Sequence, residues 1–189
     1  PGSYLNTGPA IFNTVHHYTN LFGEVLFTFI PTDQEISDEE YFINLLSRIN
    51  RLAEKTDKLF ILGSKTDSLS SNYSYILPDE TNNLDPELHC TYVNQFLEKN
   101  TTIDLNKIEG SNFLKSMEII SGKSSVFLKA FLAASLDVRG ENKKQLLETS
   151  FDKSVLTKVC PKLVAVEFNS NWQEAVLLQK DCNLVEASI

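Results

Sequence analysis

Apolar and polar positions along the chain fall into blocks that fit strands and helices in turn. Residues 25–30 are an almost unbroken apolar run rich in β-forming residues, which predicts a strand covered on both faces, as in parallel sheets. Residues 37–55 carry apolar side chains at helical spacing and predict an amphipathic helix. Residues 59–62 predict a second buried strand, ended by Gly63. This order of strand, helix and strand with short connections is typical of a βαβ unit.

Polar residues at the start of the 37–55 helix predict how it begins. Ser37 and Glu40 have capping-box spacing, in which each side chain bonds to the other residue's backbone N–H. Asp38 and Glu39 add negative charge at the positive end of the helix dipole. We expect one face of this helix to meet the core through an apolar stripe, formed by Phe42, Leu45, Leu46, Ile49, Leu52 and Ala53.

The remaining pattern completes an α/β fold. Further strands are predicted at residues 73–77, 91–98 and 163–168, the second as an edge or mixed strand, and residues 175–178 fit either a strand or a helix. Further helices are predicted at residues 7–20, 112–120, 125–136 and 141–156. We therefore expect one domain over residues 4–189, with a mostly parallel sheet and flanking helices. Residues 1–3 fit an expression scar.

Composition limits the classes of function. The 189 residues are 42% hydrophobic, which is enough for one core. With 17 Lys and Arg against 25 Asp and Glu, the net charge is −8, which argues against nucleic-acid binding and anionic membranes. Absence of a signal-peptide pattern and of a long apolar run predicts an intracellular, cytoplasmic protein. Three widely spaced cysteines have no zinc-site spacing and are expected to be reduced: Cys90, Cys160 and Cys182.

Few residues carry chemistry that can be recognised from local pattern alone. The sequence contains no nucleophile elbow, P-loop, HExxH motif or dinucleotide-binding glycine fingerprint. His16 and His17 would point about 100° apart on a helix and do not make a metal pair, while His89 is expected in solvent. Asp33 follows a predicted strand, at the sheet edge where ligands bind, and could hold a divalent metal that carries phosphate. The alternative is that Asp33 only shapes the turn before Ser37.

Seven short segments, in order, resemble bacterial-type mannose-1-phosphate guanylyltransferases. Four of them are Asn6-Thr-Gly-Pro-Ala-Ile11, Phe29-Ile-Pro-Thr-Asp-Gln34, Asn72-Tyr-Ser-Tyr-Ile76 and Phe96-Leu-Glu-Lys-Asn100. The corresponding segments of the family are Arg-Asn-Thr-Ala-Pro-Ala-Ile, a strand ending Pro-Ser/Ala-Asp-His, Gly-Tyr-Gly-Tyr-Ile and Phe-Val-Glu-Lys-Pro. Each match is weak alone, and their common order carries the resemblance.

The other three segments lie in the second half of the chain. Lys123-Ser-Ser-Val-Phe-Leu128 resembles Asn-Ser-Gly-Met-Phe-Leu, with lysine in place of asparagine. Ser150-Phe-Asp-Lys-Ser-Val-Leu-Thr-Lys158 resembles Ser-Ile-Asp-Tyr-Ala-Val-Met-Glu-Lys. Asn171-Trp-Gln-Glu174 resembles Gly-Trp-Ser-Asp. The resemblance thus extends over residues 6–178.

The resemblance implies a Rossmann-like nucleotidyltransferase (GT-A-like) domain. Enzymes of this family join mannose 1-phosphate to GTP, giving GDP-mannose and pyrophosphate. Their chemistry needs a Gly-rich basic loop for the triphosphate, two carboxylates for Mg²⁺ and polar groups that orient the sugar. By resemblance, Asp33 and Glu174 would hold the metal. Glu98, Lys99 and Lys123 would be the vestigial catalytic residues. We expect the two acidic residues, Asp33 and Glu174, to converge at one cleft.

The chain departs from the family at each of these functions. The Gly-rich loop belongs before the Asn6 segment, so the domain is expected to be incomplete at its N-terminus. Glu174 replaces an aspartate, and Asn72 and Ser74 replace glycines that would let a ligand approach the backbone. Lys123 replaces the sugar-orienting asparagine. Core positions are retained while ligand-contacting positions are changed.

Three hypotheses follow. In the first, the chain is a degenerate nucleotidyltransferase-like domain without catalysis or a cofactor, serving as a structural or protein-interaction module. Its missing unit would leave a sheet edge exposed, so this hypothesis predicts a protein partner or self-association. In the second, it is an active or split enzyme that uses Mg²⁺, GTP and a sugar 1-phosphate. In the third, it is an unrelated α/β subunit of a protein complex.

Overall fold

The computed structural model describes residues 6–66, 69–99, 112–137 and 150–174. Its α-helices are α1 (Thr7–Phe22), α2 (Glu39–Lys55), α3 (Ser124–Asp137) and α5 (Phe151–Ser154). Its strands are β1 (Leu26–Phe29), β2 (Gln34–Ile36), β3 (Leu59–Lys65), β4 (Tyr75–Asp85), β5 (Cys90–Leu97), β6 (Leu114–Lys123), β7 (Leu163–Phe168) and β8 (Trp172–Glu174). Short 3₁₀ turns are η1 (Pro86–Leu88), η3 (Leu156–Lys158) and η4 (Cys160–Lys162).

Six strands form the central sheet in the order β1-β6-β3-β7-β5-β4. The expected α/β class is confirmed, and four of the strands, β1, β3, β4 and β7, share one direction. β5 and β6 run the opposite way and lie between the others, so β3 and β7 are the adjacent pair that is parallel among the described strands. The long β6 also pairs with β4, where Tyr75 lies opposite Lys115.

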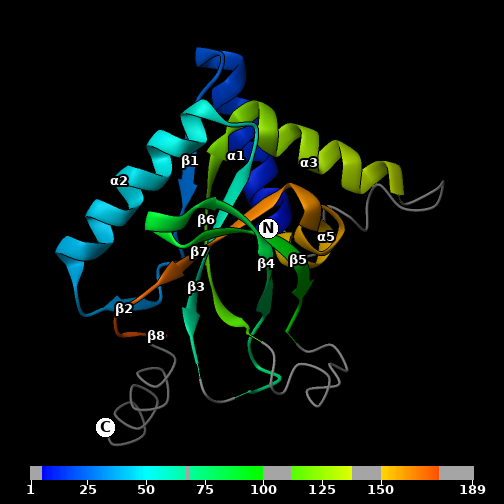
Figure 1. Cartoon of the computed structure of the whole chain (residues 1–189). Coiled ribbons are helices and arrows are strands. Elements are labelled where there is room, and N and C mark those ends of the chain that lie inside the picture. Colours follow the sequence, from blue (N-terminus) through cyan, green and yellow to red (C-terminus); the bar gives the residue numbers. More distant parts are fainter. Residues whose placement is uncertain (1–5, 67–68, 100–111, 138–149, 175–189) are drawn as a thin grey trace, which may run out of the picture.

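Helices cover both faces of this sheet (Figure 1). Along β3 the side chains alternate, with Leu59 and Ile61 in one core cluster and Phe60 and Leu62 in the other. The first cluster packs against α1, α3 and α5, and the second packs against α2. The predicted buried strand is confirmed, and its two covered faces divide the protein into two packed layers.

Strand β6 corrects one expectation of the sequence. Residues 112–120 were expected to be helical, whereas residues 114–123 form β6. The segment has buried residues on both of its faces, with Met117 and Ile119 in one core and Ile120 in the other. An apolar run that is buried on both sides has no clear period of two, so it can be mistaken for a helix.

Two boundaries also differ from expectation. The N-cap of α2 is Asp38, whose carboxylate accepts the Tyr41 N–H at 2.9 Å, so the helix begins two residues after Ser37. Strand β3 continues past Gly63 to Lys65. A Cβ at Gly63 would lie 2.7 Å from the Leu114 Cβ, so this glycine allows β6 to approach closely.

Other expectations fall into three groups. The first helix, the strands near residues 73–77, 91–98 and 163–168, and the start of the 125–136 helix are confirmed. Of the predicted 141–156 helix, the described part contains α5 and the start of η3. Residues 141–149 and 175–178 lie outside the described residues.

The two described cysteines lie in the core. Cys90 and Cys160 are buried free thiols, and Cys182 lies outside the described residues. Burial raises the pKa of Cys90 to about 12 and also raises that of Cys160, so both stay protonated at neutral pH. Among the described residues, no helix is both long and apolar enough to cross a membrane.

β1 lies at one end of the sheet order. It was expected to be covered on both faces, but all four of its residues are only half-buried. On one side β1 pairs with β6, from Leu26 opposite Lys123 to Phe29 opposite Ile120. Its other edge has no strand partner within the described part of the chain.

Candidate functional site

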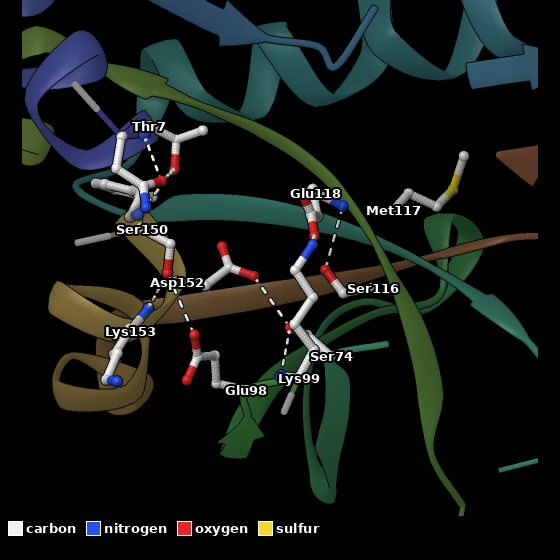
Figure 2. Close-up of polar contacts among 12 residues, drawn as sticks. Thr7, Ser74, Glu98, Lys99, Ser116, Met117, Glu118, Ser150, Asp152 and Lys153 are labelled. Atoms are coloured by element: carbon white, nitrogen blue, oxygen red, sulfur yellow. Dashed lines mark hydrogen bonds and ion pairs between the residues drawn. The ribbon is translucent and has the colours of Figure 1, made fainter. Parts of the chain in front are cut away.

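Polar side chains from four separate segments meet beside α5 (Figure 2). They come from the residue before β4, from the end of β5, from the middle of β6 and from the start of α5. We call this set the polar cluster; its members are Ser74, Glu98, Lys99, Glu118, Ser150 and Asp152. Three of its four source segments carry the family resemblance, so residues matched only by order in the sequence also meet in space.

Members of the polar cluster are bonded to one another. The Lys99 Nζ lies 2.6 Å from Oε1 of Glu118 and forms an ion pair with it. The Ser74 hydroxyl donates to Oδ2 of Asp152 at 3.2 Å and accepts the Lys99 backbone N–H at 3.1 Å. The Ser150 hydroxyl donates to Oε1 of Glu98 at 3.3 Å. The cluster is therefore closed by contacts within the protein.

Backbone contacts fix the position of the cluster. The Thr7 hydroxyl accepts the Phe151 N–H at 3.0 Å, which joins the start of α1 to the start of α5. Ser150 caps α5 by accepting the Lys153 N–H at 3.2 Å. Since Asp152 lies in the first turn of α5, these two contacts hold its carboxylate toward Ser74.

Glu118 has a left-handed backbone in the middle of a strand, with a φ of +56°. This conformation favours glycine and costs a residue with a Cβ about 1–2 kcal/mol. The Ser116 hydroxyl accepts the Glu118 N–H at 3.2 Å and supports the turn of the chain at this point. This turn of the backbone directs the Glu118 carboxylate toward Lys99.

Asp152 is the titratable group most affected by this environment. Burial raises the pKa of Asp152 to about 7, and the negative charge of Glu118 acts in the same direction. The Ser74 hydrogen bond and the Lys99 ammonium oppose this rise, while Glu98 adds to it. Near neutral pH the carboxyl group can therefore both hold and release a proton.

A cavity of about 220 Å³ lies beside the cluster. Its polar lining includes Thr7, Glu118 and Asp152, and its apolar walls include Phe29 and Ile30 at the end of β1. This volume is below the roughly 300–1,000 Å³ typical of ligand pockets. The cavity thus has room for a small chemical group next to the carboxyl groups of Glu118 and Asp152, and it borders the end of β1.

The proposed metal residues lie elsewhere, in a small second sheet of β2 and β8. Gln34 is paired with Glu174 across this ladder, so Asp33 is next to the position opposite Glu174. The expected convergence of positions 33 and 174 is present in the backbone. Asp33 has an exposed side chain and does not line the 220 Å³ cavity. The described residues contain no group of three or more metal-ligating side chains that could hold an ion.

Gln34 replaces the family's histidine and has a structural role. Its side-chain nitrogen donates to the Met117 carbonyl at 2.6 Å, and its oxygen accepts the Trp172 indole N–H at 2.9 Å. These bonds tie the small sheet to β6. Both polar atoms of the Gln34 side chain are therefore engaged in contacts within the protein.

Lys123 does not join the polar cluster. It lies at the end of β6, five residues from Glu118, which corresponds to roughly 16 Å along a strand. There its Nζ forms an ion pair of 2.7 Å with Asp57, and this contact lowers the pKa of Asp57. The structure thus brings Glu98 and Lys99 together and places Lys123 apart from them.

Sequence reasoning assigned no role to Ser150, Asp152, Ser116 or Glu118. A signal existed for the first two, because the Ser150-Phe-Asp segment belongs to the resemblance. For Glu118 no local signal existed, since a left-handed residue inside a strand is not visible in an apolar pattern.

Comparisons with known proteins support the fold. No protein-family model matches the sequence, and no curated protein matches it. Solved structures do match, including a mannose-6-phosphate isomerase from Helicobacter pylori, with a TM-score of 0.69 and 20% identity over 89% of this chain. A mannose-1-phosphate geranyltransferase from Thermus thermophilus matches with a TM-score of 0.68 and 16% identity over 89% of this chain.

A UDP-glucose pyrophosphorylase complexed with UDP-glucose matches over 97% of this chain, with a TM-score of 0.61 and 16% identity. The chain spans 71%, 51% and 63% of the lengths of these three structures, in the order given. At these identities the likeness concerns the fold. The chain therefore shares the α/β fold of these three structures and spans part of their length.

Proposed function

We propose that this chain is a sugar-nucleotidyltransferase-like domain without catalysis, which acts as a structural or protein-interaction module. The observation that carries this proposal is the Lys99–Glu118 ion pair of 2.6 Å. In a working site the lysine would meet an anionic or polar ligand. Here a carboxylate of the same chain already holds it, so a ligand would have to displace Glu118.

Charge supports the same conclusion. Three carboxyl groups, those of Glu98, Glu118 and Asp152, accompany one ammonium group in the polar cluster. A sugar phosphate or a nucleotide would bring further negative charge next to them, which costs free energy in a partly buried site. The chain as a whole has a net charge of −8, which adds to this repulsion.

The left-handed backbone of Glu118 supports a different register for one segment of the family resemblance. Glycine favours a left-handed backbone, so we place the family's Asn-Ser-Gly stretch on Ser116, Met117 and Glu118 in place of residues 123–125. On this register the sugar-orienting asparagine becomes Ser116 and the glycine becomes Glu118. Both changes put side chains of the protein where a sugar would otherwise approach the backbone.

The direct test mixes the protein with GTP, Mg²⁺ and mannose 1-phosphate and measures pyrophosphate release. We expect none, and we expect no heat of GTP binding in calorimetry. GTP binding at micromolar concentration or steady pyrophosphate release would contradict the proposal.

One observation favours a second function, an active or split GDP-mannose-forming enzyme. The cavity borders the end of β1, and one edge of β1 has no partner among the described strands, so a further strand could complete the site. Asp33 and Glu174 would then hold Mg²⁺, which commonly binds one or two carboxylates together with substrate phosphates. If activity is found in a longer reading frame, Asp33→Ala should abolish it, whereas Ser37→Ala should leave it unchanged.

A further inference from the structure

A second concave site lies on α2, which packs on the other face of the sheet from α5. Figure 1 shows the two helices on either side of the sheet. The site is a shallow, open hollow of about 290 Å³ between α2 and the turn that follows β4. The lining residues are Arg48, Arg51, Leu52, Lys55, Asp85 and Leu88. Three of these six carry positive charge, in a chain with eight more acidic than basic residues.

Helical spacing explains why the three cations meet. Arg48, Arg51 and Lys55 are separated by three and four residues, so their side chains project from one face of α2. Leu52 lies on the same face and forms an apolar floor with the buried Leu88. The same helix buries Leu45, Ile49 and Ala53 against the sheet, which keeps the cationic face turned outward.

The acidic groups near this site are already engaged. Asp85 accepts the backbone N–H groups of Glu87 and Leu88 at 3.0 and 3.1 Å, as the cap of η1. Glu87 contacts the Arg48 guanidinium at 3.8 Å, with 89% of its side chain exposed, which is a weak surface pair. The Nε–H of Arg51 donates to the Ser47 carbonyl at 3.3 Å, and one Nη–H donates to the Ser47 hydroxyl at 3.4 Å. The guanidinium groups therefore keep further N–H donors for a ligand.

We propose that this α2 pocket binds a phosphomonoester group. Two guanidinium groups offer the paired N–H donors that suit phosphate oxygens, and Lys55 adds a third positive charge. The apolar floor of Leu52 and Leu88 would contact the carbon skeleton that carries the phosphate. The site does not depend on the proposed function, because it shares no residue with the polar cluster.

The test follows backbone amide shifts of the whole chain, labelled with nitrogen-15, during titration with inorganic phosphate. We expect saturable shifts at Arg51, Lys55 and Leu88 that give one dissociation constant. Sodium chloride at equal ionic strength should not reproduce them. If no saturable shift appears at these three residues, the proposal is overturned.

Three variants sharpen the test. Arg48→Gln should weaken phosphate binding about tenfold, as expected for the loss of a charge-assisted hydrogen bond. Glu87→Gln should strengthen binding, because it removes the internal partner of Arg48. Lys162→Gln removes an exposed cation outside the pocket and should have no effect. Equal weakening by Arg48→Gln and Lys162→Gln would show general charge attraction and would overturn the proposal.

Two organic probes distinguish the sources of the phosphate group. Glucose 6-phosphate represents a free metabolite, and a phosphoserine peptide represents a modified protein. The probe that binds at least several-fold more tightly than inorganic phosphate identifies the source. If neither organic probe binds more tightly than inorganic phosphate, the apolar floor does not contact a ligand and the assignment to a phosphomonoester is wrong.

Discussion

Asp152 should make the stability of the protein depend on pH. Its pKa in the folded protein is about 7, against a value of 3.8 without this environment. The folded state therefore binds the proton more tightly than the unfolded state. The protonated carboxyl therefore contributes to the free energy of unfolding at acidic pH. This contribution, on the order of 4 kcal/mol, is lost as the pH rises from about 4 to about 7.

Asp152→Asn removes this titration and keeps an acceptor for Ser74. We expect the variant to have a higher free energy of unfolding than the original protein, and we expect this increase to be larger at pH 8 than at pH 4. Urea unfolding at both pH values measures the difference. An unchanged difference between the two pH values would mean that Asp152 is ionised in the fold.

At the scale of the residue, the family resemblance alone selected candidates for the site. Glu98 and Lys99 could be selected because they belong to a quoted segment, and they do lie in the polar cluster. Lys123 belongs to another quoted segment, and its ammonium group forms an ion pair with Asp57 outside the polar cluster. Backbone conformation, such as that of Glu118, depends on neighbours that are distant in the sequence.

The start of α2 allows a matched test at the scale of an element. Asp38→Ala removes the acceptor for the Tyr41 N–H and should lower the unfolding free energy by about 1 kcal/mol. Ser37→Ala should change it much less, because Ser37 lies outside the helix and its side chain does not cap it. Chemical denaturation of both variants makes the comparison. Similar losses in the two variants would instead support a capping box at Ser37.

Elements were predicted best where one face is solvated. Helix α2 has one buried face and one exposed face, and its period was clear in the sequence. Strand β6 is buried on both faces, which removes the alternation that identifies a strand. Strand direction also could not be predicted, because β5 and β6 run against their neighbours as a result of long-range connections.

At the scale of the molecule, two features predict association with a protein: the end of α1 and the edge of β1 that no strand pairs with among the described residues. Leu21 and Phe22 are 59% and 70% exposed. Tyr18 joins them to the sheet through ring contacts with Phe22 and with Phe27 of β1. Unpaired strand edges and adjacent apolar side chains favour contact with another polypeptide.

Leu21→Lys should therefore reduce self-association or binding of a partner, measured by light scattering over a range of concentrations. Leu132→Lys is a matched control, because Leu132 on α3 is 60% exposed and lies on another element. We expect the control to behave like the original protein. A monomer at all concentrations for every variant, with no partner recovered, would contradict this prediction.

The pairing of β1 with β6 has a consequence for how the protein is made. Leu26 and Lys123 are 97 positions apart, and Phe29 and Ile120 are 91 positions apart. During synthesis on the ribosome, the hydrogen bonds between β1 and β6 can form only after residue 123 has emerged. Contacts of such long sequence separation slow folding, since a large loop has to close first. A fragment that stops before β6 would leave β1 without this partner, so we expect such a fragment to lose the β1 edge of the sheet.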